Sequence, residues 1–358
     1  MPIPLKTEVI EVHPEYPDLK KITYCARIIR QGGLVIFPTD TVYGIAADYM
    51  NPQAMQRLRE VKKRSEGKPF ALLISQMGII SNYTSTNDPA LYKLISQYWP
   101  GPLTVVVPVR DGGGTIGVRM PDHAIALKLL QEAQCAVAAP SANIEGAQEP
   151  TTCQEALKDL DGLVDVAIDG GPSKIGKGST VVDLTTKEPV VLREGVIKES
   201  EIKRIVARKT VLFICTGNSC RSVMAEYLLK KAIGRRDDVE VISAGTGVFI
   251  QSRASDETIL VLHAEGIDAT HHVSQPINSI LLKKADLIFV MTRNHRQQVL
   301  ERVPEVEKRL YLLKEFVPNA NYYLSELDIP DPIGRSHEGY KECIAVIKEA
   351  VGKIVDLI

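Results

Sequence analysis

The sequence has little of what marks a secreted or disulfide-stapled protein. Its 358 residues include six scattered cysteines, one tryptophan and only 5% aromatic residues. Cysteines so sparse and uneven do not form a disulfide framework, and without a C-x-x-C pair a structural zinc site is not expected either. This usage fits a reducing compartment, so we expect a cytoplasmic protein.

Two further absences limit the class of partner. Met1–Ile10 lacks the apolar core of a signal peptide, and no apolar run approaches the roughly 20 residues that span a membrane, so no membrane association is expected. The formal net charge is -1, which leaves no global positive field to hold nucleic acid. Any link to RNA would have to be local or indirect.

Short apolar runs alternate with amphipathic segments along the chain, which is the pattern of an α/β protein. A length of 358 residues favours two domains. In the first part we expect a helix over 52–63 and strands over 33–37, 70–74, 104–109, 136–139 and 180–184.

An abrupt change of pattern marks a second unit. A charged, helix-like stretch over 199–209 runs into the apolar run 211–214, and a loop and a helix over about 223–231 follow. This order opens a doubly wound parallel sheet, in which ligands bind at the carboxyl ends of the strands. Later elements are expected over 240–243, 287–291 and 339–357. We therefore predict domains over 1–207 and 208–358.

The segment CTGNSCRS, from Cys215 to Ser222, lies between the expected strand and helix of this second unit. Five residues between Cys215 and Arg221 can curl so that successive backbone N–H groups point at one anion, and the helix adds its positive end. Arg221 offers a planar fork to two phosphate oxygens, and the positive surroundings favour Cys215 as a thiolate nucleophile. The loop positions expected to cradle the phosphate are Thr216, Gly217, Asn218, Ser219, Cys220 and Ser222.

A phosphoryl transfer to a thiolate also needs a proton donor for the leaving group. Asp331 is the candidate, because it is held between Pro330 and Pro332 in an expected loop. The same carboxylate could later activate the water that hydrolyses the phosphocysteine. Cys215, Arg221 and Asp331 are thus the predicted catalytic residues.

Residues 210–358 resemble the low-molecular-weight phosphotyrosine phosphatase superfamily. Beyond the Cys215–Ser222 loop and Asp331, the segments Ser243–Thr246 and Ala285–Ile288 are similar to that family. The resemblance implies a doubly wound parallel-sheet phosphatase domain, with a phosphoprotein as its substrate and no cofactor.

The residues around the predicted acid bear on the choice of substrate. Tyrosine-directed members carry aromatic side chains after the Asp-Pro pair, whereas this chain has Ile333 and Gly334. Bacterial protein-arginine phosphatases are similar to this form and to Leu313–Phe316, but they carry Thr where this loop has Ser219. The resemblance therefore favours phosphoarginine, with phosphotyrosine, other phosphate esters or arsenate as alternatives.

In the first part, polar and charged residues gather at the ends of expected elements. The segments are Pro38–Gly44, Lys62–Ser65, Pro140–Asn143, Gly178–Asp183 and Leu192–Gly195. Hydroxyls, an amide and cations in these places suit a triphosphate pocket, whereas the missing G-x-x-x-x-G-K-[ST] motif excludes a P-loop NTPase. Each segment alone could be an ordinary turn or helix end, but together they predict a nucleotide site.

In this order and spacing, the segments resemble the threonylcarbamoyl-AMP synthase family across residues 15–200. The match extends to Trp99–Thr104 and Val118–Pro121 and departs from many members at Lys68–Phe70. The family joins L-threonine, bicarbonate and ATP into threonylcarbamoyl-AMP and releases pyrophosphate, and other proteins use the product to modify an adenosine of tRNA. The implied fold is a twisted mixed sheet with helices and a large concave face.

The same resemblance assigns roles to individual residues. ATP would be bound by Lys62, Arg64, Ser141, Asn143 and Arg193. The threonine would lie near Thr39, Tyr43, Arg119 and Ser179. Mg²⁺ would be held by the triphosphate, with no protein side chain as ligand. The alternative is a first domain that only binds a nucleotide or RNA and targets a protein-tyrosine phosphatase.

Two cysteines, Cys215 and Cys220, share the phosphate loop. If the loop curls around an anion, their side chains approach each other, and a sulfenic acid on Cys215 could be trapped as a disulfide. The alternative is that Cys220 packs beneath the loop as a small apolar side chain.

Overall fold

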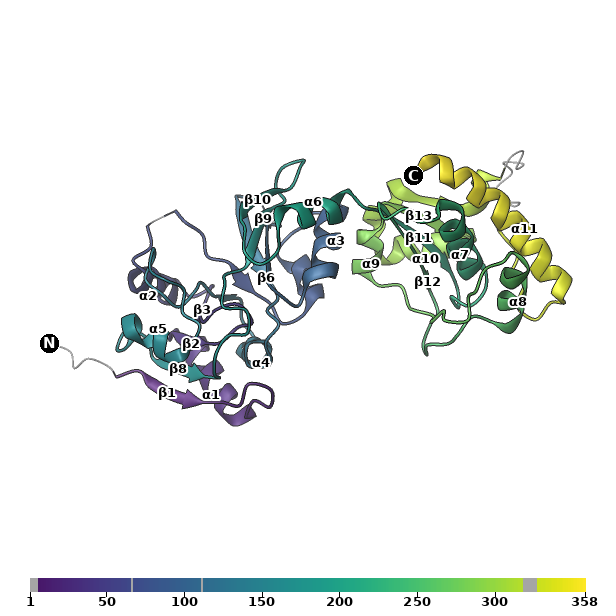
Figure 1. The fold of residues 1–358 in the computed structure, drawn as a ribbon. Coiled ribbons are helices and arrows are strands. Elements are labelled where there is room, and N and C mark those ends of the chain that lie inside the picture. The colour runs from purple at the N-terminus through teal and green to yellow at the C-terminus, as the bar shows by residue number, and fades with distance from the viewer. Residues whose placement is uncertain (1–5, 66, 111, 318–326) are drawn as a thin grey trace. The chain divides into compact units, whose positions relative to one another are not determined.

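The computed structural model describes residues 6–65, 67–110, 112–317 and 327–358. These residues form two compact units (Figure 1), one within Met1–Thr86 and Leu94–Lys203, the other within Asn87–Lys93 and Arg204–Ile358. The expected domain boundary between residues 207 and 208 stays a prediction.

The N-terminal unit is built on a mixed sheet. The strands, in chain order, are β1 (Glu8–Glu11), β2 (Val35–Phe37), β3 (Gly44–Asp48), β4 (Leu72–Leu73), β5 (Leu103–Pro108), β6 (Thr115–Arg119), β7 (Val137–Ala138), β8 (Val166–Asp169), β9 (Thr180–Asp183) and β10 (Val190–Arg193). Across the sheet they follow the order β1-β8-β2-β3-β7-β4-β6-β5-β9-β10, with parallel and antiparallel neighbours.

Helices cover the part of this sheet around β2 and β8. The helices of the N-terminal part are α1 (Leu19–Arg30), α2 (Pro52–Lys62), α3 (Pro89–Tyr98), α4 (Ala124–Ala133), α5 (Cys153–Leu160) and α6 (Glu199–Ala207). Apolar residues of α1 and α4, such as Ile29 and Leu129, form one core with Val35 of β2 and Val166 of β8. Helix α2 packs on β3, and α5 packs on β8 and β2.

The other part of the sheet, from β4 to β10, faces a cavity. Side chains alternate between the two faces of a strand, and on β6 the alternate residues Thr115, Gly117 and Arg119 line the cavity, as Thr104 and Val106 do on β5. This is the concave face that the family resemblance implies. It places polar residues of neighbouring strands around one space.

The C-terminal unit is a parallel sheet. The strands are β11 (Lys209–Cys215), β12 (Val239–Gly245), β13 (Leu287–Val290) and β14 (Leu310–Leu312), in the order β12-β11-β13-β14. After β11 the chain adds β12 on one side of this strand and then β13 on the other side. The carboxyl end of β11 therefore lies at the switch point where such folds bind ligands. Cys215 ends this strand.

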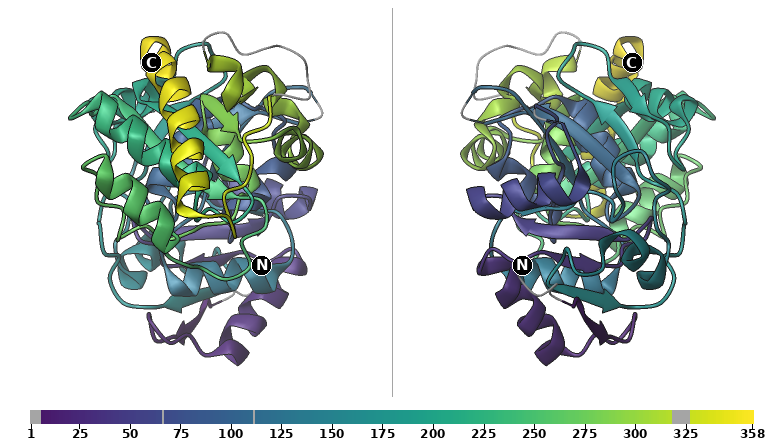
Figure 2. Two further views of the ribbon diagram at one scale, coloured as in Figure 1. Left: turned by 90° about the vertical axis from the view of Figure 1, so that its right-hand side faces the viewer. Right: turned by 90° about the vertical axis from the view of Figure 1, so that its left-hand side faces the viewer.

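Helices cover both faces of the parallel sheet. They are α7 (Arg221–Ile233), α8 (Asp256–Ala264), α9 (Ser279–Lys284), α10 (Arg293–Arg302) and α11 (His337–Ile354). Phe213 packs with residues of α7, α8 and α11, and Ile214 packs with residues of α9 and α10. Figure 2 shows α11, in yellow, lying over the strands. Burial on both faces explains the unbroken apolar run of β11.

The expected class is confirmed, as a mixed sheet followed by a separate parallel sheet. Two details differ from the expectation. Lys209, expected in a helix-like stretch, is the first residue of β11 and pairs with Val239. The strands expected over 70–74 and 136–139 are two residues long each, and β7 is followed closely by Pro140, which has no N–H to extend a ladder.

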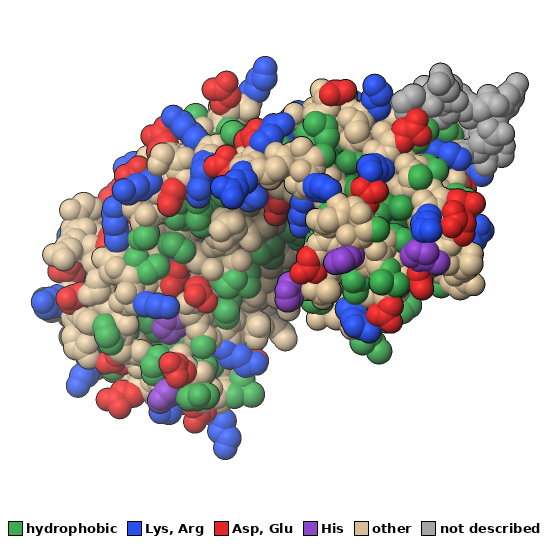
Figure 3. All heavy atoms as spheres, turned by 45° about the vertical axis from the view of Figure 1, so that its right-hand side comes forward, with side chains coloured by type: hydrophobic (Ala, Val, Ile, Leu, Met, Phe, Trp, Pro, Cys, Tyr) green, Lys and Arg blue, Asp and Glu red, His purple; other side chains and the backbone are tan. Residues whose placement is uncertain are grey.

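Among the described residues, no helix is both long and apolar enough to cross a lipid bilayer. On the face shown in Figure 3, acidic and basic side chains are interspersed. This agrees with a formal net charge of -1.

Candidate functional sites

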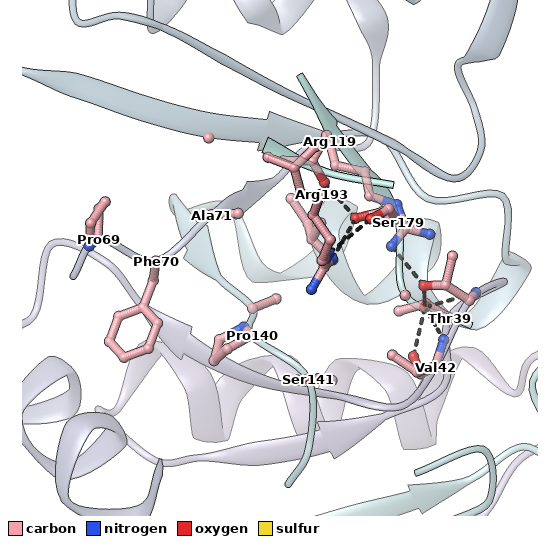
Figure 4. A pocket seen from close by; sticks show the side chains of 18 of the residues that line it. Thr39, Val42, Pro69, Phe70, Ala71, Arg119, Pro140, Ser141, Ser179 and Arg193 are labelled. Atoms are coloured by element: carbon pink, nitrogen blue, oxygen red, sulfur yellow. Dashed lines mark hydrogen bonds between the residues drawn. The ribbon is translucent and has the colours of Figure 1, made fainter. Parts of the chain in front are cut away.

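The N-terminal unit holds a cavity of about 430 Å³ on the concave face of its sheet. Residues predicted for ATP and threonine that line it are Thr39, Tyr43, Arg64, Arg119, Ser141, Ser179 and Arg193. The other two, Lys62 and Asn143, are hydrogen-bonded to Ser141. Figure 4 shows Arg119, Arg193 and Ser179 on one side of the cavity, and Phe70 and Pro69 on the other.

Arg119 is 6% exposed, and each of its three guanidinium nitrogens bonds to the protein. Nε donates to the Gly101 carbonyl at 3.0 Å, Nη1 donates to Thr41 Oγ1 at 2.7 Å, and Nη2 forms an ion pair with Asp40. Burial lowers the pKa of Arg119, and the Asp40 charge opposes that shift. Arg119 therefore ties the loop after β2 to β6 and to the segment before β5.

Lys62, the last residue of α2, is 2% exposed. Its Nζ donates to the Ser141 carbonyl at 2.6 Å and to Asn143 Oδ1 at 3.2 Å, and Ser141 Oγ donates to the same Oδ1 at 2.6 Å. Burial, followed by the nearby charge of Arg64, lowers the pKa of Lys62 to about 8. The predicted ATP residues from two distant segments are thus joined in one network.

Arg64 lines the cavity beside Phe70. Its guanidinium carbon lies 4.9 Å from the centre of the Phe70 ring, and Nη2 donates to the Pro69 carbonyl at 2.9 Å. The Arg59 guanidinium carbon lies 5.0 Å from the same ring. Burial lowers the pKa of Arg64. Phe70, at the place where this chain departs from many family members, thus positions a predicted phosphate binder.

Ser179 and Arg193 form the other end of the cavity. Ser179 Oγ lies 2.8 Å from Thr104 Oγ1 and accepts from Arg193 Nη2 at 3.2 Å, while Arg193 Nε donates to the Ser179 carbonyl at 3.1 Å. Arg193 Nη1 is also 3.4 Å from Glu149 Oε1. Two hydroxyls, a guanidinium and a carboxylate therefore meet at one wall.

Two residues predicted near threonine direct their hydroxyls into the protein. Thr39 Oγ1 donates to the Val42 carbonyl at 2.7 Å. The Tyr43 hydroxyl donates to the Gly171 carbonyl at 2.6 Å, and burial raises the pKa of Tyr43. Both residues shape the cavity wall, and a direct contact of either hydroxyl with threonine stays a prediction.

The reading of the sequence missed Glu149, Asp40 and Thr104 as parts of this site. Asp40 lies inside the Pro38–Gly44 segment that the sequence already predicted to be part of the site. Its negative charge among hydroxyls could have indicated a partner for a buried cation. Thr104 is a polar residue in an otherwise apolar strand. Glu149 lies in a loop, and only the folded chain brings it to Arg193.

The second site is the loop between β11 and α7. Four of its carbonyls accept hydrogen bonds from surrounding segments: those of Cys215 and Thr216 from the N–H groups of residues 246 and 247, that of Asn218 from His272 Nε2, and that of Ser219 from the N–H of residue 255. The C=O and the next N–H of a trans peptide point in opposite directions. The N–H groups that follow these carbonyls are therefore directed away from the surrounding segments, as an anion nest requires.

Asn218 holds this loop in shape. Its backbone is left-handed, with φ of 51°, a conformation that few residues other than glycine adopt. Nδ2 donates to Ser222 Oγ at 3.0 Å and to Ser243 Oγ at 2.7 Å, and Oδ1 accepts from the Gln275 N–H at 2.9 Å. Ser222 Oγ in turn lies 3.0 Å from Cys215 Sγ, where the hydroxyl can donate to a thiolate.

Arg221 begins α7 and joins the predicted acid to the loop. Its Nη1 donates to the Ile329 carbonyl at 2.9 Å, and Nη2 lies 2.5 Å from Asp331 Oδ2. The nucleophile, the phosphate binder and the acid candidate therefore lie together at the carboxyl end of β11. Their catalytic roles stay predictions.

His295, in the first turn of α10, was missed by the reading of the sequence. Its Nε2 lies 2.9 Å from Thr216 Oγ1, and its Nδ1 lies 2.8 Å from Thr292 Oγ1. Burial, and then the charge of Arg221, lowers the pKa of His295 to about 4. At neutral pH a neutral imidazole therefore links the phosphate loop to α10.

Two apolar side chains near the loop were also missed. Phe249 is 97% exposed and Ile250 is 85% exposed, in the segment that follows β12. The same segment is bonded to the loop through the N–H groups of Thr246 and Gly247. Phe249 is therefore an exposed aromatic side chain on a segment that contacts the phosphate loop.

Cys220 turns its thiol toward other neighbours. Its Sγ lies 3.2 Å from Ser255 Oγ and 3.8 Å from the Tyr340 hydroxyl, and the residue belongs to the core beneath the loop. A disulfide with Cys215 under oxidation stays a prediction.

Gly245, the last residue of β12, sits against the phosphate loop. A Cβ at this position would lie 2.4 Å from the Thr216 carbonyl oxygen and 3.0 Å from the Asn218 nitrogen, so Gly245→Ala must displace the loop. We expect this variant to bind inorganic phosphate about tenfold more weakly, because at least one hydrogen bond to the anion is lost. Isothermal titration calorimetry on the full chain measures this.

Gly247→Ala is the matched control, because its Cβ would lie 3.4 Å from Thr216 Cγ2, which is ordinary contact. This variant should bind phosphate like the wild type. Unchanged binding by Gly245→Ala would show that the loop is not the anion site.

Two family models match the chain. The Sua5/YciO/YrdC model, described as telomere recombination, matches residues 27–195. The low molecular weight phosphotyrosine protein phosphatase model matches residues 210–358. The two matched stretches contain the two sites described above.

Individual proteins support the first match. The threonylcarbamoyl-AMP synthase of Pyrococcus abyssi is 39% identical over 194 residues, which cover 52% of this chain and 57% of that protein. The chain thus spans little more than half the length of that relative. A Methanocaldococcus jannaschii protein named for the same activity is 32% identical over 208 residues, covering 56% of this chain and 99% of its own.

A solved structure extends the likeness to three dimensions. The P. abyssi Sua5 protein complexed with L-threonine superposes with a TM-score of 0.54 and 27% identity, covering 86% of this chain and 99% of that one. The chain therefore belongs, through its N-terminal part, to the Sua5/YciO/YrdC family, and its C-terminal part matches the low molecular weight phosphotyrosine protein phosphatase model.

Proposed function

We propose that the chain is a bifunctional enzyme whose N-terminal unit makes threonylcarbamoyl-AMP from L-threonine, bicarbonate and ATP. The observation that carries this proposal is the cavity in which Arg64 and Arg193 flank the hydroxyls of Ser141 and Ser179. Such an arrangement suits a polyphosphate, because cations neutralise it and hydroxyls orient it. The likeness to a structure complexed with L-threonine supports the choice of amino acid.

In the proposed reaction the threonine nitrogen first forms a carbamate with the carbon of bicarbonate. A carbamate oxygen then attacks the α-phosphorus of ATP, and pyrophosphate leaves. Lys62 and Arg64 stabilise the negative charge of the phosphates, and the Lys62 contacts keep Ser141 and Asn143 in place. Mg²⁺ enters with the triphosphate, whose oxygens are its preferred ligands.

The product would serve other proteins that modify an adenosine of tRNA, so the proposal does not require this chain to bind tRNA itself. The competing hypothesis is an N-terminal unit that binds a nucleotide or RNA without catalysis. Release of pyrophosphate that depends on threonine separates the two.

The C-terminal unit, in our proposal, dephosphorylates a phosphoprotein through Cys215. The thiolate attacks phosphorus, Asp331 gives a proton to the leaving group, and a water activated by Asp331 then hydrolyses the phosphocysteine. The supporting observation is that Arg221 contacts Asp331 while Ser222 contacts Cys215. When a phosphate binds, the Arg221 guanidinium can therefore release Asp331 and bind the phosphate instead.

For the substrate we favour phosphoarginine. Ile333 and Gly334 follow the Asp-Pro pair without an aromatic wall, and the Ser219 hydroxyl has one hydrogen-bond partner among the described residues, the weak acceptor Cys220 Sγ at 3.7 Å. That hydroxyl and the Asp331 carboxylate suit a guanidinium. The exposed Phe249 favours the second candidate, phosphotyrosine, because its ring offers a face to stack on.

Replacing Lys62 or Arg64 by Ala removes a cation from the proposed ATP site. Each variant should lower kcat/KM for ATP by roughly ten- to a hundredfold, since a charged hydrogen bond contributes about 1.5–3 kcal/mol. Release of pyrophosphate in the presence of threonine and bicarbonate is the measurement. Hydrolysis of a phosphate ester by the C-terminal unit should not change.

Lys63→Asn is the matched control, because Lys63 is exposed and left-handed, with φ of 50°, and Asn tolerates that conformation. Its pyrophosphate release should equal that of the wild type. Wild-type rates in both alanine variants would refute the assignment of Lys62 and Arg64.

The affinity for ATP should depend on pH through Lys62. Because burial lowers its pKa to about 8, the ammonium is charged below that pH and becomes neutral above it. ATP should therefore bind more weakly as the pH rises from 7 to 9.5, as measured by calorimetry. Lys62→Arg keeps its charge and should bind with little dependence on pH, and identical profiles of the two proteins would contradict this role.

Ser219→Ile should move the phosphatase toward phosphotyrosine, because it adds bulk and removes the hydroxyl that a guanidinium approaches. The ratio of kcat/KM for phosphoarginine to that for phosphotyrosine, measured on matched peptides, should fall by about tenfold for one lost charge-assisted hydrogen bond. A wild type that prefers phosphotyrosine, and loses this preference in Phe249→Ala, would establish the second candidate instead.

A further inference from the structure

A single carboxylate, that of Glu149, stands among the residues that line the N-terminal cavity within the described part of the chain. Burial lowers the pKa of Lys62 and of Arg119, and in both cases the charge of Glu149 acts in the opposite direction. The carboxylate is thus close enough to these cations and to Arg193 to act on all three.

The position of this carboxylate is limited by the backbone just before β9. A Cβ on Gly178 would lie 2.5 Å from Glu149 Oε2 and 2.9 Å from Oε1. The carboxylate therefore rests directly against Gly178, the residue before Ser179. Any larger side chain at position 178 would push it away.

The Glu149 carboxylate is partly exposed, and its direct ion pair with the protein is a long one. Across residues 6–65, 67–110, 112–317 and 327–358, the one side chain that bonds to Glu149 is Arg193, through Nη1 and Oε1 at 3.4 Å. Arg193 at the same time donates to Ser179. A carboxylate facing a polyphosphate site repels the phosphates, and a cationic group on a second ligand would offset that repulsion.

Of the substrates in the proposed reaction, the amino acid carries such a cation. We propose that Glu149 binds the amino group of the amino-acid substrate and accepts the proton that this group must lose. This inference rests on the proposed synthase function. Glu149 lies at the wall of Ser179 and Thr104, and Ser179 is one of the residues predicted to lie near the threonine.

One proton of the ammonium leaves before the new bond forms. The ammonium gives one proton to the Glu149 carboxylate, which passes it to solvent. The lone pair of the resulting amine forms the C–N bond to the carbon of bicarbonate, a C–O bond of bicarbonate breaks, and the leaving hydroxide takes a second proton from the nitrogen and departs as water. Arg193 keeps one carboxylate oxygen oriented, which leaves the other for the ammonium.

Glu149→Gln tests the binding role with little change of shape. Calorimetry on the full chain compares L-threonine with (R)-3-hydroxybutyrate, which has the same skeleton without the amino group. The wild type should prefer threonine by about tenfold or more, the size expected for a charge-assisted contact. In Glu149→Gln this preference should largely disappear.

Glu145→Gln is the matched control. Glu145 lies four residues earlier, pairs with Lys68 at 2.7 Å and is not among the cavity-lining residues. It should keep the wild-type preference for threonine. A general weakening of the cavity by loss of any glutamate would lower the preference in both variants and would contradict the inference.

The proton-accepting role has its own readout. In pyrophosphate release at saturating ATP, kcat/KM for threonine of Glu149→Gln should fall by about tenfold at pH 7 and recover toward pH 9.5, because free amine then comes from solution. KM for ATP should not rise, since a negative charge has been removed.

A wild type that binds no L-threonine overturns the proposed synthase function and this inference with it. A wild type that binds threonine, with the same preference retained in Glu149→Gln, overturns the inference alone. A variant that keeps the preference but needs more Mg²⁺ would assign Glu149 to the metal and overturn it as well.

Discussion

The N-terminal site depends on the buried ion pair between Arg119 and Asp40. The pair, together with the Arg119 contacts to Thr41 and Gly101, joins three segments that are distant in sequence, and these segments form one wall of the cavity. A buried charge that loses its partner is costly, by about 3–5 kcal/mol. The pair therefore holds this wall of the cavity in place. The other cations, Arg64 and Arg193, can then bind a ligand beside a wall of fixed shape.

In the C-terminal site the ligand-binding groups are also held in place before a ligand binds, but by different groups. Here the backbone provides the positive surroundings: the outward carbonyls of the loop are held by neighbouring segments, and Asn218 fixes the turn between them. Prior orientation of dipoles and charges means that little reorganisation is needed when an anion binds. In each unit, buried contacts within the protein determine where the ligand-binding groups lie.

How far the sequence predicted these sites depended on the spacing of their parts. The phosphate loop was predictable because its nucleophile, anion nest and Arg221 lie within seven consecutive residues, between an apolar run and a helix. The mixed sheet was expected, but its strand order was not, because pairing such as Leu72 with Ala138 depends on contacts between distant segments. For the same reason the sequence did not reveal that the Tyr43 hydroxyl bonds to Gly171, or that Glu149 meets Arg193.

The central claim is that the cavity around Arg64, Ser141 and Arg193 is a catalytic site. The most direct test supplies the full chain with ATP, L-threonine and ¹³C-labelled bicarbonate and examines the nucleotide products by mass spectrometry. The account predicts threonylcarbamoyl-AMP that carries the ¹³C label in its carbamoyl group, formed together with pyrophosphate. ATP that stays intact, or an adenylate without the label, would contradict it.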